Sequence, residues 1–271
     1  MITRFIEHKL RGLIRTIECD EKDVHLSIHP DPLARVKLVL IHGSLGGGIF
    51  GWGNVLPHLI PHATCVIPDL PGFNNSVSLQ ESTPLEMAKA IYSRLKKLGI
   101  DGPFRIVGQS IGGAIAIEMY HLDPAKVESL ILWGSPGLTK PMDAHMAELF
   151  HVETIEEMLI LHEMLFNENK IHSKRSQIAW LNLHQHSMIV NAAMHEWLLR
   201  GKSVINKEIS CPVKIIWGSE DKLVPVIEAY EIVKKIPHAK LSVLNGASHS
   251  GDLERVESQI RLAKEILGGI S

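Results

Sequence analysis

Cysteine is scarce in this 271-residue sequence, and the few thiols are widely separated. Cys19, Cys65 and Cys211 form no Cys-x-x-Cys pair, and their number is odd. A disulfide framework needs paired cysteines and a thiolate zinc site needs clustered ones, so the sequence favours neither. Reduced thiols are typical of a cytoplasmic protein, which is the compartment that we expect.

Long hydrophobic runs and a strong excess of either charge are also missing. No apolar stretch approaches the roughly 20 residues that cross a bilayer, and no signal-peptide pattern is present. The formal net charge is −2 and the isoelectric point is about 6.8. Such a balance gives no reason to expect a nucleic-acid partner. We therefore expect a soluble chain that has no integral membrane span.

The composition that remains is ordinary for a globular protein. Hydrophobic residues make up 45% of the chain and charged residues 21%, which supplies enough apolar material for a sizeable core. A chain of this length is expected to form one large α/β domain with an insertion, or two small domains.

Strand-like and helical patterns alternate through most of the chain. Helical patterns extend from Thr83, whose spacing to Glu86 predicts a capping box, to about residue 98, and over 114–121, 226–235 and the last stretch to about 267. This alternation predicts an α/β fold with a mostly parallel central sheet flanked by helices. The predicted strands are residues 24–28 at the sheet edge, and 36–41, 65–67, 104–107, 130–133, 213–217 and 241–244 inside it.

The pattern changes between residues 136 and 206, where strand-like runs give way to helical ones at 155–165 and 177–199. We therefore predict a core domain of residues 1–135 and 207–271, interrupted by a helical lid at 136–206. The methionines of the lid are expected to form an adaptable apolar surface towards the substrate. They are Met142, Met146, Met158, Met164, Met188 and Met194.

The first 18 residues combine an apolar face with a basic one that carries Arg4, Arg11 and Arg15. A basic amphipathic helix can lie on an anionic membrane or on a partner, but packing on its own domain is the reading that we favour. Gly12 weakens a helix, so the second half of this stretch is alternatively a first strand.

A Gly-x-Ser-x-Gly pattern, Gly108-Gln109-Ser110-Ile111-Gly112, joins a predicted strand to a predicted helix. In this context the pattern is typical of a nucleophile elbow, a turn so sharp that the central residue has strained backbone angles and glycine is needed on either side. The turn would raise the Ser110 hydroxyl above the sheet. The helix N-terminus beneath it would offer free N–H groups to a developing negative charge.

A serine nucleophile needs a base and an acid, and the loops after the last two predicted strands supply both. His249 follows the last strand, and its imidazole is the natural base near neutral pH. Asp221 follows the preceding strand and can orient that imidazole, with the adjacent Glu220 as the rival acid. The carboxyl ends of parallel strands meet at one edge of a sheet, so we expect the three groups to lie together there.

A glycine-rich loop, His42-Gly43-Ser44-Leu45-Gly46-Gly47-Gly48, follows a predicted buried strand. The spacing and the lysine of a phosphate-binding Walker loop are missing from it. Its pairing with the later Gly-x-Ser-x-Gly pattern indicates an oxyanion loop instead.

Together these stretches resemble the α/β-hydrolase superfamily, in its lid-bearing branch of serine esterases, lipases and carbon–carbon bond hydrolases. The resemblance covers about residues 24–135 and 207–267 and is carried also by Asp69-Leu70-Pro71-Gly72-Phe73, by Trp217-Gly218-Ser219-Glu220-Asp221, and by His249 with Glu254. It implies an oxyanion hole formed by the backbone N–H groups of Ser44 and Ile111. Two positions depart from the superfamily's pattern. Asn74 replaces a usual glycine, and Ser250 replaces the tryptophan that often follows the histidine in carbon–carbon bond hydrolases.

The resemblance implies hydrolysis of a carboxylic ester or thioester with an apolar acyl group, through an acyl intermediate on Ser110. No cofactor is expected. Carbon–carbon bond hydrolysis or acyl transfer with the same triad is an alternative, and a hydrolase-like small-molecule receptor is another. The oligomeric state is left open.

Histidines are frequent in the predicted lid, which raises the question of a metal site. His184 and His186 are two residues apart in a helical pattern and so face away from one another. His162-Glu163 lacks the second histidine of a zinc-protease helix. No metal site is therefore expected among the seven histidines His145, His151, His162, His172, His184, His186 and His195.

Overall fold

The computed structural model describes residues 15–17, 23–30, 34–44, 47–74, 76–141, 143–167, 173–200, 203–251 and 256–268. Most of the N-terminal amphipathic stretch lies outside these residues, as do Met142, His172 and Glu254. The alternative prediction of a first strand is confirmed for Arg15–Ile17, which forms β1.

In the described part of the chain, eight strands form one sheet in the order β1-β2-β4-β3-β5-β6-β7-β8. β1 and β2 are antiparallel to their neighbours, and all pairs from β4 to β8 are parallel, so the predicted mostly parallel sheet is confirmed. β2 was predicted at the sheet edge, but β1 covers that side. The bounds of the other strands are β2 Leu26–His29, β3 Lys37–Ile41, β4 Thr64–Pro68, β5 Phe104–Gln109, β6 Val127–Trp133, β7 Val213–Gly218 and β8 Lys240–Leu244.

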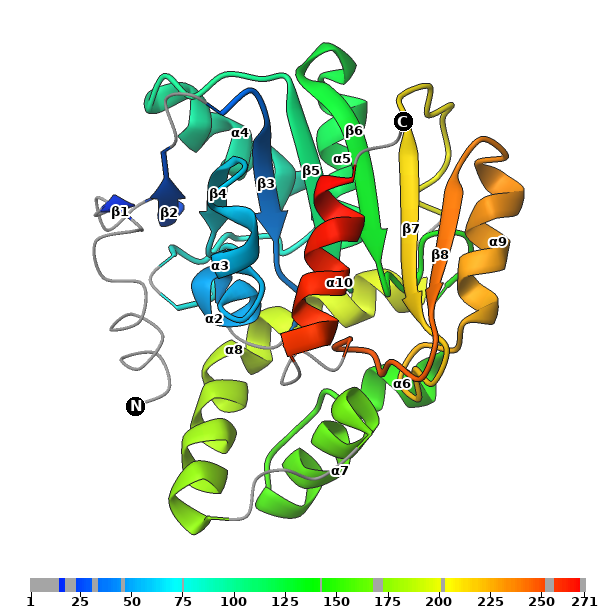
Figure 1. Cartoon of the computed structure of the whole chain (residues 1–271). Helices are drawn as coiled ribbons and strands as arrows, with labels where there is room; N and C mark the ends of the chain where they lie inside the picture. Colours follow the sequence, from blue (N-terminus) through cyan, green and yellow to red (C-terminus); the bar gives the residue numbers. More distant parts are fainter. Residues whose placement is uncertain are drawn as a thin grey trace.

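Helices cover both faces of this sheet (Figure 1). Alternate strand residues enter opposite cores because successive side chains of a strand point to opposite faces. In β3, Val39 and Ile41 pack in the core under α4, α5 and α9, whereas Leu38 and Leu40 pack in the core under α2, α3 and α10. These helices are α2 Gly48–Trp52, α3 Leu56–Leu59, α4 Pro84–Lys97, α5 Gly112–Leu122, α9 Ile227–Lys235 and α10 Val256–Leu267, with a short 3₁₀ turn at Pro124–Lys126.

Between β6 and β7 the chain forms α6 (Ala144–Glu148), α7 (Ile155–Phe166) and α8 (Lys174–Arg200). Figure 1 shows these helices beyond the arrowheads of the central strands. We call residues 134–212 the β6–β7 segment; its action as a lid stays a prediction. Met158 and Met194 of this segment are fully buried in the same core as α4 and α5.

Local sequence explains where two of the helices begin. The Thr83 hydroxyl accepts the Glu86 N–H at the start of α4, but the Glu86 carboxylate pairs with Lys89, so the predicted capping box is only half formed. A complete capping box, which the sequence analysis missed, joins Thr154 and Glu157 at the start of α7.

The chain order makes one position of the sheet special. From β3 the chain runs outwards to β4 on one side and then returns to β5 on the other. Loops that leave β3 and β5 therefore diverge at their carboxyl ends, and such a switch point is where open α/β sheets bind their ligands. Gly43 and Ser110 follow these two strands.

Candidate active site

Ser110 lies in the sharp turn between β5 and α5 and has a φ angle of +53°. Backbone atoms cross so closely there that a side chain at Gly108 would collide with the Gly112 carbonyl. A Cβ atom on Gly112 would lie 2.6 Å from the carbonyl oxygen of Ile41. The predicted strained turn is thus present, and its glycines are required by contact with neighbouring backbone.

The loop after β3 passes directly against Ser110. A Cβ atom on Gly43 would lie only 2.9 Å from the Ser110 Cβ, so only glycine fits at this approach. Ser44, which comes next, is 2% exposed. The Ile111 N–H, at the N-terminus of α5, donates to no other group in the described residues. Ile111 thus follows Ser110 directly, and Ser44 follows the glycine that lies against Ser110. Their role as oxyanion donors stays a prediction.

His42 holds this loop as a neutral imidazole. Its Nε2 accepts the Leu70 N–H at 2.9 Å, so the proton is on Nδ1, which donates to the Gly43 carbonyl at 2.7 Å. Burial lowers the pKa of His42 and outweighs the opposing effect of the Gly43 carbonyl. The histidine thereby fixes the residue that lies against Ser110.

Asp69, at the end of β4, anchors the other end of the same loop. Its carboxylate accepts the Gly48 N–H at 2.6 Å, the Asn74 amide at 3.1 Å and the His25 Nδ1 at 2.8 Å. Burial raises the pKa of Asp69, but the hydrogen bond from His25 and the charges and donors around it lower the pKa overall. Asn74 has a φ angle of +44°, as expected of an asparagine in a glycine position.

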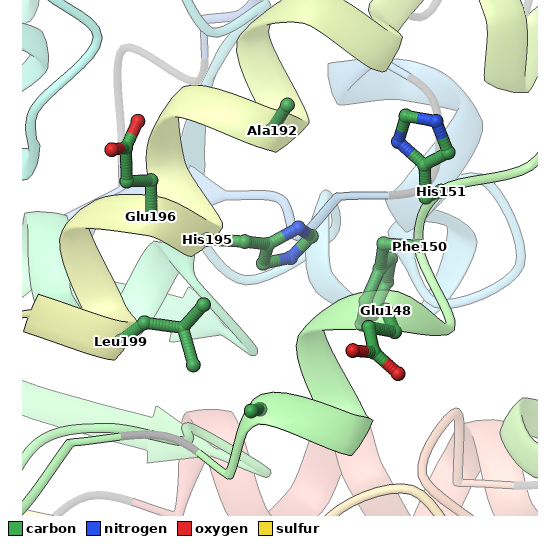
Figure 2. A pocket seen from close by; sticks show the side chains of 8 residues that line it. Glu148, Phe150, His151, Ala192, His195, Glu196 and Leu199 are labelled. Atoms are coloured by element: carbon green, nitrogen blue, oxygen red, sulfur yellow. The ribbon is translucent and has the colours of Figure 1, made fainter.

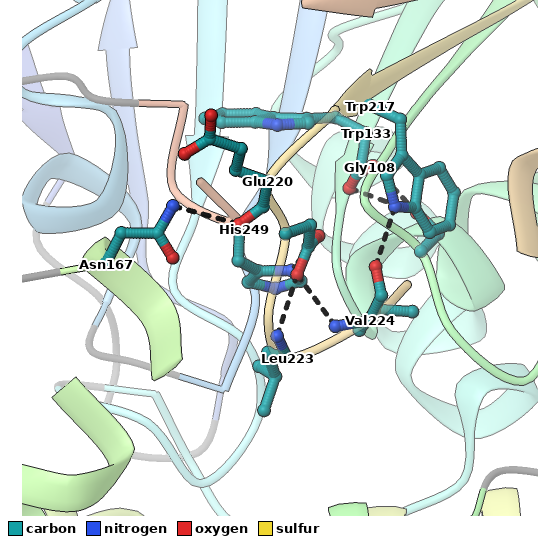
Figure 3. A network of polar contacts seen from close by, with 10 residues as sticks. Gly108, Trp133, Asn167, Trp217, Glu220, Leu223, Val224 and His249 are labelled. Carbon is teal, nitrogen blue, oxygen red and sulfur yellow. Dashed lines mark hydrogen bonds and ion pairs between the residues drawn. The ribbon is translucent and has the colours of Figure 1, made fainter. Parts of the chain in front are cut away.

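His249 and Asp221 form a buried pair beyond the ends of β8 and β7. The His249 Nδ1 lies 2.8 Å from the Asp221 Oδ2, and the two side chains are 3% and 0% exposed. The other oxygen of Asp221 accepts the N–H groups of Leu223 and Val224 at 3.0 and 2.7 Å (Figure 3). These backbone donors fix the carboxylate so that its free oxygen faces the imidazole.

Glu220, the rival acid, is exposed and not part of this pair. Its backbone carbonyl accepts a hydrogen bond of 2.9 Å from the Asn167 amide, as Figure 3 shows. This bond ties the loop after β7 to the end of α7.

Ser110 and His249 are brought together across the end of β6. The Ser110 N–H donates to the Trp133 carbonyl at 2.8 Å. The next residue, Gly134, has a φ angle of +54°, and a Cβ atom there would lie 3.3 Å from the His249 ring. In the described residues the two side chains make no direct hydrogen bond.

The β6–β7 segment contributes its own buried histidines. His162 of α7 and His184 of α8 face each other with their Nε2 atoms 3.4 Å apart, beside Trp180. Burial lowers the pKa of His162 to about 3 and that of His184 to about 4. In the described residues no three or more His, Cys, Asp or Glu side chains are grouped to hold a metal ion. The pair therefore acts as a neutral contact between two helices.

Sequence analysis missed several residues that shape this site. The His25–Asp69 contact carried no local signal, because its two residues are 44 positions apart in the chain. Gly134, whose Cβ position lies against His249, was also missed. His195 was noted only as one of many lid histidines, although it lies 3.4 Å from Ser44. A positive φ requirement could have marked Gly134, since it follows a predicted strand directly.

This architecture is similar to that of known proteins. Residues 37–156 match the family model of the α/β hydrolase fold. A bacterial membrane phospholipase A superposes with a TM-score of 0.82, at 20% identity over 99% of this chain and 90% of that one. The chain has the α/β-hydrolase fold. These similarities support the prediction that the chain is a hydrolase, without specifying the bond that it cleaves.

Two further proteins are similar along most of their length. A 2-hydroxy-6-oxo-6-phenylhexa-2,4-dienoate hydrolase of Burkholderia cepacia is 28% identical over 252 residues, which are 85% of this chain and 87% of the relative. The structure of a meta-cleavage product hydrolase from Pseudomonas fluorescens IP01 has a TM-score of 0.74 and 20% identity, covering 90% of this chain and 94% of that one. In the described part of this chain, no helix combines the length and apolar character that a bilayer crossing requires.

Proposed function

We propose that this α/β hydrolase cleaves a carbon–carbon bond next to a ketone, with Ser110, His249 and Asp221 as its triad. The observation that supports the chemistry is the buried His249–Asp221 pair at 2.8 Å, on the same sheet edge as the strained Ser110 turn. The choice of bond rests on the relatives. The compound in the name of the Burkholderia relative contains a ketone and a carboxylate but no ester, so its hydrolysis breaks a carbon–carbon bond.

The proposed steps follow from the positions of these groups. The Ser110 oxygen attacks the ketone carbon while His249 takes the hydroxyl proton, and Asp221 stabilises the imidazolium. The Ser44 and Ile111 N–H groups bind the oxygen that becomes negative. In the dienoate of the relative's name, the proton of the 2-hydroxyl group must first move to C5, which makes C2 a ketone and C5 a CH₂ group. The C5–C6 bond then breaks, and its electron pair leaves as the conjugated dienolate of the C2 ketone, whose oxygen takes a proton. Water, activated by His249, releases the acyl group from Ser110.

Ester hydrolysis is the second candidate, because the same steps release an alcohol in place of the enolate. One observation favours it. Position 250 is serine, whereas a tryptophan often follows the histidine in carbon–carbon bond hydrolases. Thus the relatives favour the carbon–carbon alternative over the ester prediction, while this single residue favours the ester.

A substrate comparison tests the proposal. The purified chain is assayed with 2-hydroxy-6-oxo-6-phenylhexa-2,4-dienoate and with aryl esters of graded acyl length, beside Ser110→Ala. We expect kcat/KM for the dienoate to exceed that for every ester by about 100-fold or more, and Ser110→Ala to lose both activities at an unchanged Tm. Turnover of the esters alone would make the chain an esterase. Full activity in Ser110→Ala would overturn the triad.

A further inference from the structure

His195 connects the β6–β7 segment to the loop against Ser110. Its side chain projects from α8, is 4% exposed, and stacks on Phe150 with ring centroids 4.3 Å apart and an interplanar angle of 37°. The Nε2 atom lies 3.4 Å from the hydroxyl oxygen of Ser44. One face of the ring is therefore packed against Phe150, while a polar edge points at the loop.

Ser44 is one residue away from the closest approach to the nucleophile. A Cβ atom on the preceding Gly43 would lie 2.9 Å from the Ser110 Cβ and 3.5 Å from its Oγ. The Ser44 hydroxyl and the N–H that the proposed mechanism uses belong to the same residue. A contact that holds the hydroxyl therefore also restricts the movement of this N–H. His42 braces Gly43 from the sheet side, and His195 contacts Ser44 from the α8 side.

The same ring lines a cavity of about 270 Å³ between α6 and α8 (Figure 2). A group bound in this cavity would touch the imidazole that contacts Ser44. The cavity is lined by Ala144, Glu148, Phe150, His151, Ala192, His195, Glu196 and Leu199.

We infer that His195 is a positioning residue for the oxyanion hole, which holds Ser44 through its hydrogen bond and so couples the place of α8 to the reactivity of Ser110. This inference rests on the proposed role of Ser110 as the nucleophile. It concerns how the oxyanion hole is ordered and holds for a ketone or an ester substrate alike.

Burial makes His195 suitable for this role, because it lowers the pKa of the imidazole to about 4. Near neutral pH the ring is uncharged. It can therefore hold the Ser44 hydroxyl by a hydrogen bond without adding a positive charge next to that hydroxyl.

The test measures how fast a fluorophosphonate labels Ser110. In this reaction the serine oxygen bonds to phosphorus, fluoride leaves, and the phosphoryl oxygen relies on the same oxyanion donors. Saturation kinetics separate the maximal labelling rate from the half-saturating concentration. His195→Phe keeps the ring and its stack on Phe150 but removes the nitrogens. Ser44→Ala removes the hydroxyl and keeps the backbone N–H. His162→Phe is the matched control, because it makes the same substitution at another buried histidine that is not in contact with this loop.

We expect the maximal rate to fall about tenfold in His195→Phe and in Ser44→Ala, the size of one lost hydrogen bond, with the half-saturating concentration nearly unchanged. The double variant should be no slower than either single one, because both remove the same contact. His195→Gln should recover most of the rate, and His162→Phe should keep the wild-type rate.

Other outcomes separate the possible failures. An unlabelled wild type would reject Ser110 as the nucleophile and with it the proposed function. Two results would overturn the role of His195 and leave the proposed function standing. One is labelling at the wild-type rate in folded His195→Phe. The other is a rate in the double variant that falls by the product of the two single losses. If His195→Phe does not fold, an unchanged rate in Ser44→Ala overturns the inference equally well.

Discussion

At the scale of single residues, the acid of the proposed triad is held by more than its partner. The Asp221 Oδ1 accepts two backbone N–H groups, from Leu223 and Val224. An asparagine at this position would use its single carbonyl oxygen for these donors. Its NH₂ group would then face the His249 Nδ1, which selects the tautomer that cannot accept the Ser110 proton.

We therefore predict that Asp221→Asn lowers kcat by about 10³–10⁴, which corresponds to about 4–5 kcal/mol of barrier. The matched variant Glu220→Gln should stay within about tenfold of wild type, because Glu220 is exposed and outside the pair. Steady-state kinetics on the best substrate measures both. A larger loss in Glu220→Gln than in Asp221→Asn would move the acid to Glu220.

Gly134 offers a second residue-scale prediction, with Gly99 as its control. Both have positive φ angles, +54° and +66°, so alanine at either position should cost about 1–2 kcal/mol of stability. Only at Gly134 would the added methyl group touch His249, at 3.3 Å; nothing lies within 4 Å of the corresponding atom at Gly99.

We expect Gly134→Ala to lower kcat at least tenfold and Gly99→Ala to leave it unchanged, with similar losses of unfolding free energy. Denaturant titration and kinetics on the same preparations test this. Equal kcat values in the two variants would show that His249 tolerates the displacement.

At the scale of elements, the contact between α7 and α8 should make the protein sensitive to acid. His162 and His184 meet in this contact, and burial lowers both pKa values from 6.5, to about 3 and about 4. Below about pH 6.5 the two histidines are protonated in the unfolded chain but still neutral in the folded protein. Stability therefore falls as the pH falls towards 4, by up to about 1.4 kcal/mol per pH unit for each histidine.

We predict that His162→Phe makes the dependence of unfolding free energy on pH shallower between about pH 6 and pH 4.5. The measurement is denaturant unfolding at several pH values. Trp180→Phe is the control, since it disturbs the same contact without removing a titratable group and should keep the wild-type slope. An unchanged slope in His162→Phe would mean that the pair takes up its protons equally in both states.

At the scale of the whole molecule, the β6–β7 segment enters and leaves the core at neighbouring points. The Leu138 carbonyl accepts the Ser203 hydroxyl at 2.7 Å and the Ile205 N–H at 3.3 Å. A short linker can therefore replace most of the segment with little loop-closure cost. The core would lose Met158 and Met194, so some stability is lost as well.

Replacing residues 140–201 with about three Gly or Ser residues should leave the sheet folded and lower Tm. If the segment is a lid that contacts the substrate, kcat/KM should fall at least tenfold more for long acyl groups than for acetyl esters. Circular dichroism and a graded ester series measure the two effects. Equal losses for all chain lengths would remove the segment from substrate recognition.

The strained turn at Ser110 and the mostly parallel sheet could be predicted from the sequence, because both depend on local patterns. Gly108, Ser110 and Gly112 obey the backbone limits of one sharp turn, and the observed φ of +53° at Ser110 follows from them. Apolar strand-like runs that alternate with helical patterns predicted the parallel sheet, because the strands of such a sheet are buried on both faces. The pairing of β1 with the outer side of β2 was not predicted, and β1 itself was predicted only as an alternative to a helix, because it is short and follows a stretch with helical periodicity.

The contacts that shape the site were decided by tertiary structure, because they join residues that no local pattern relates. Asp221 and the neighbouring Glu220 offer the same functional group, and only the backbone donors of Leu223 and Val224 turn one of them towards His249. Ser44 and His195 are 151 positions apart and meet only because α8 crosses the carboxyl edge of the sheet. A sequence specifies which groups are available, but the distance between them depends on the packing of whole elements.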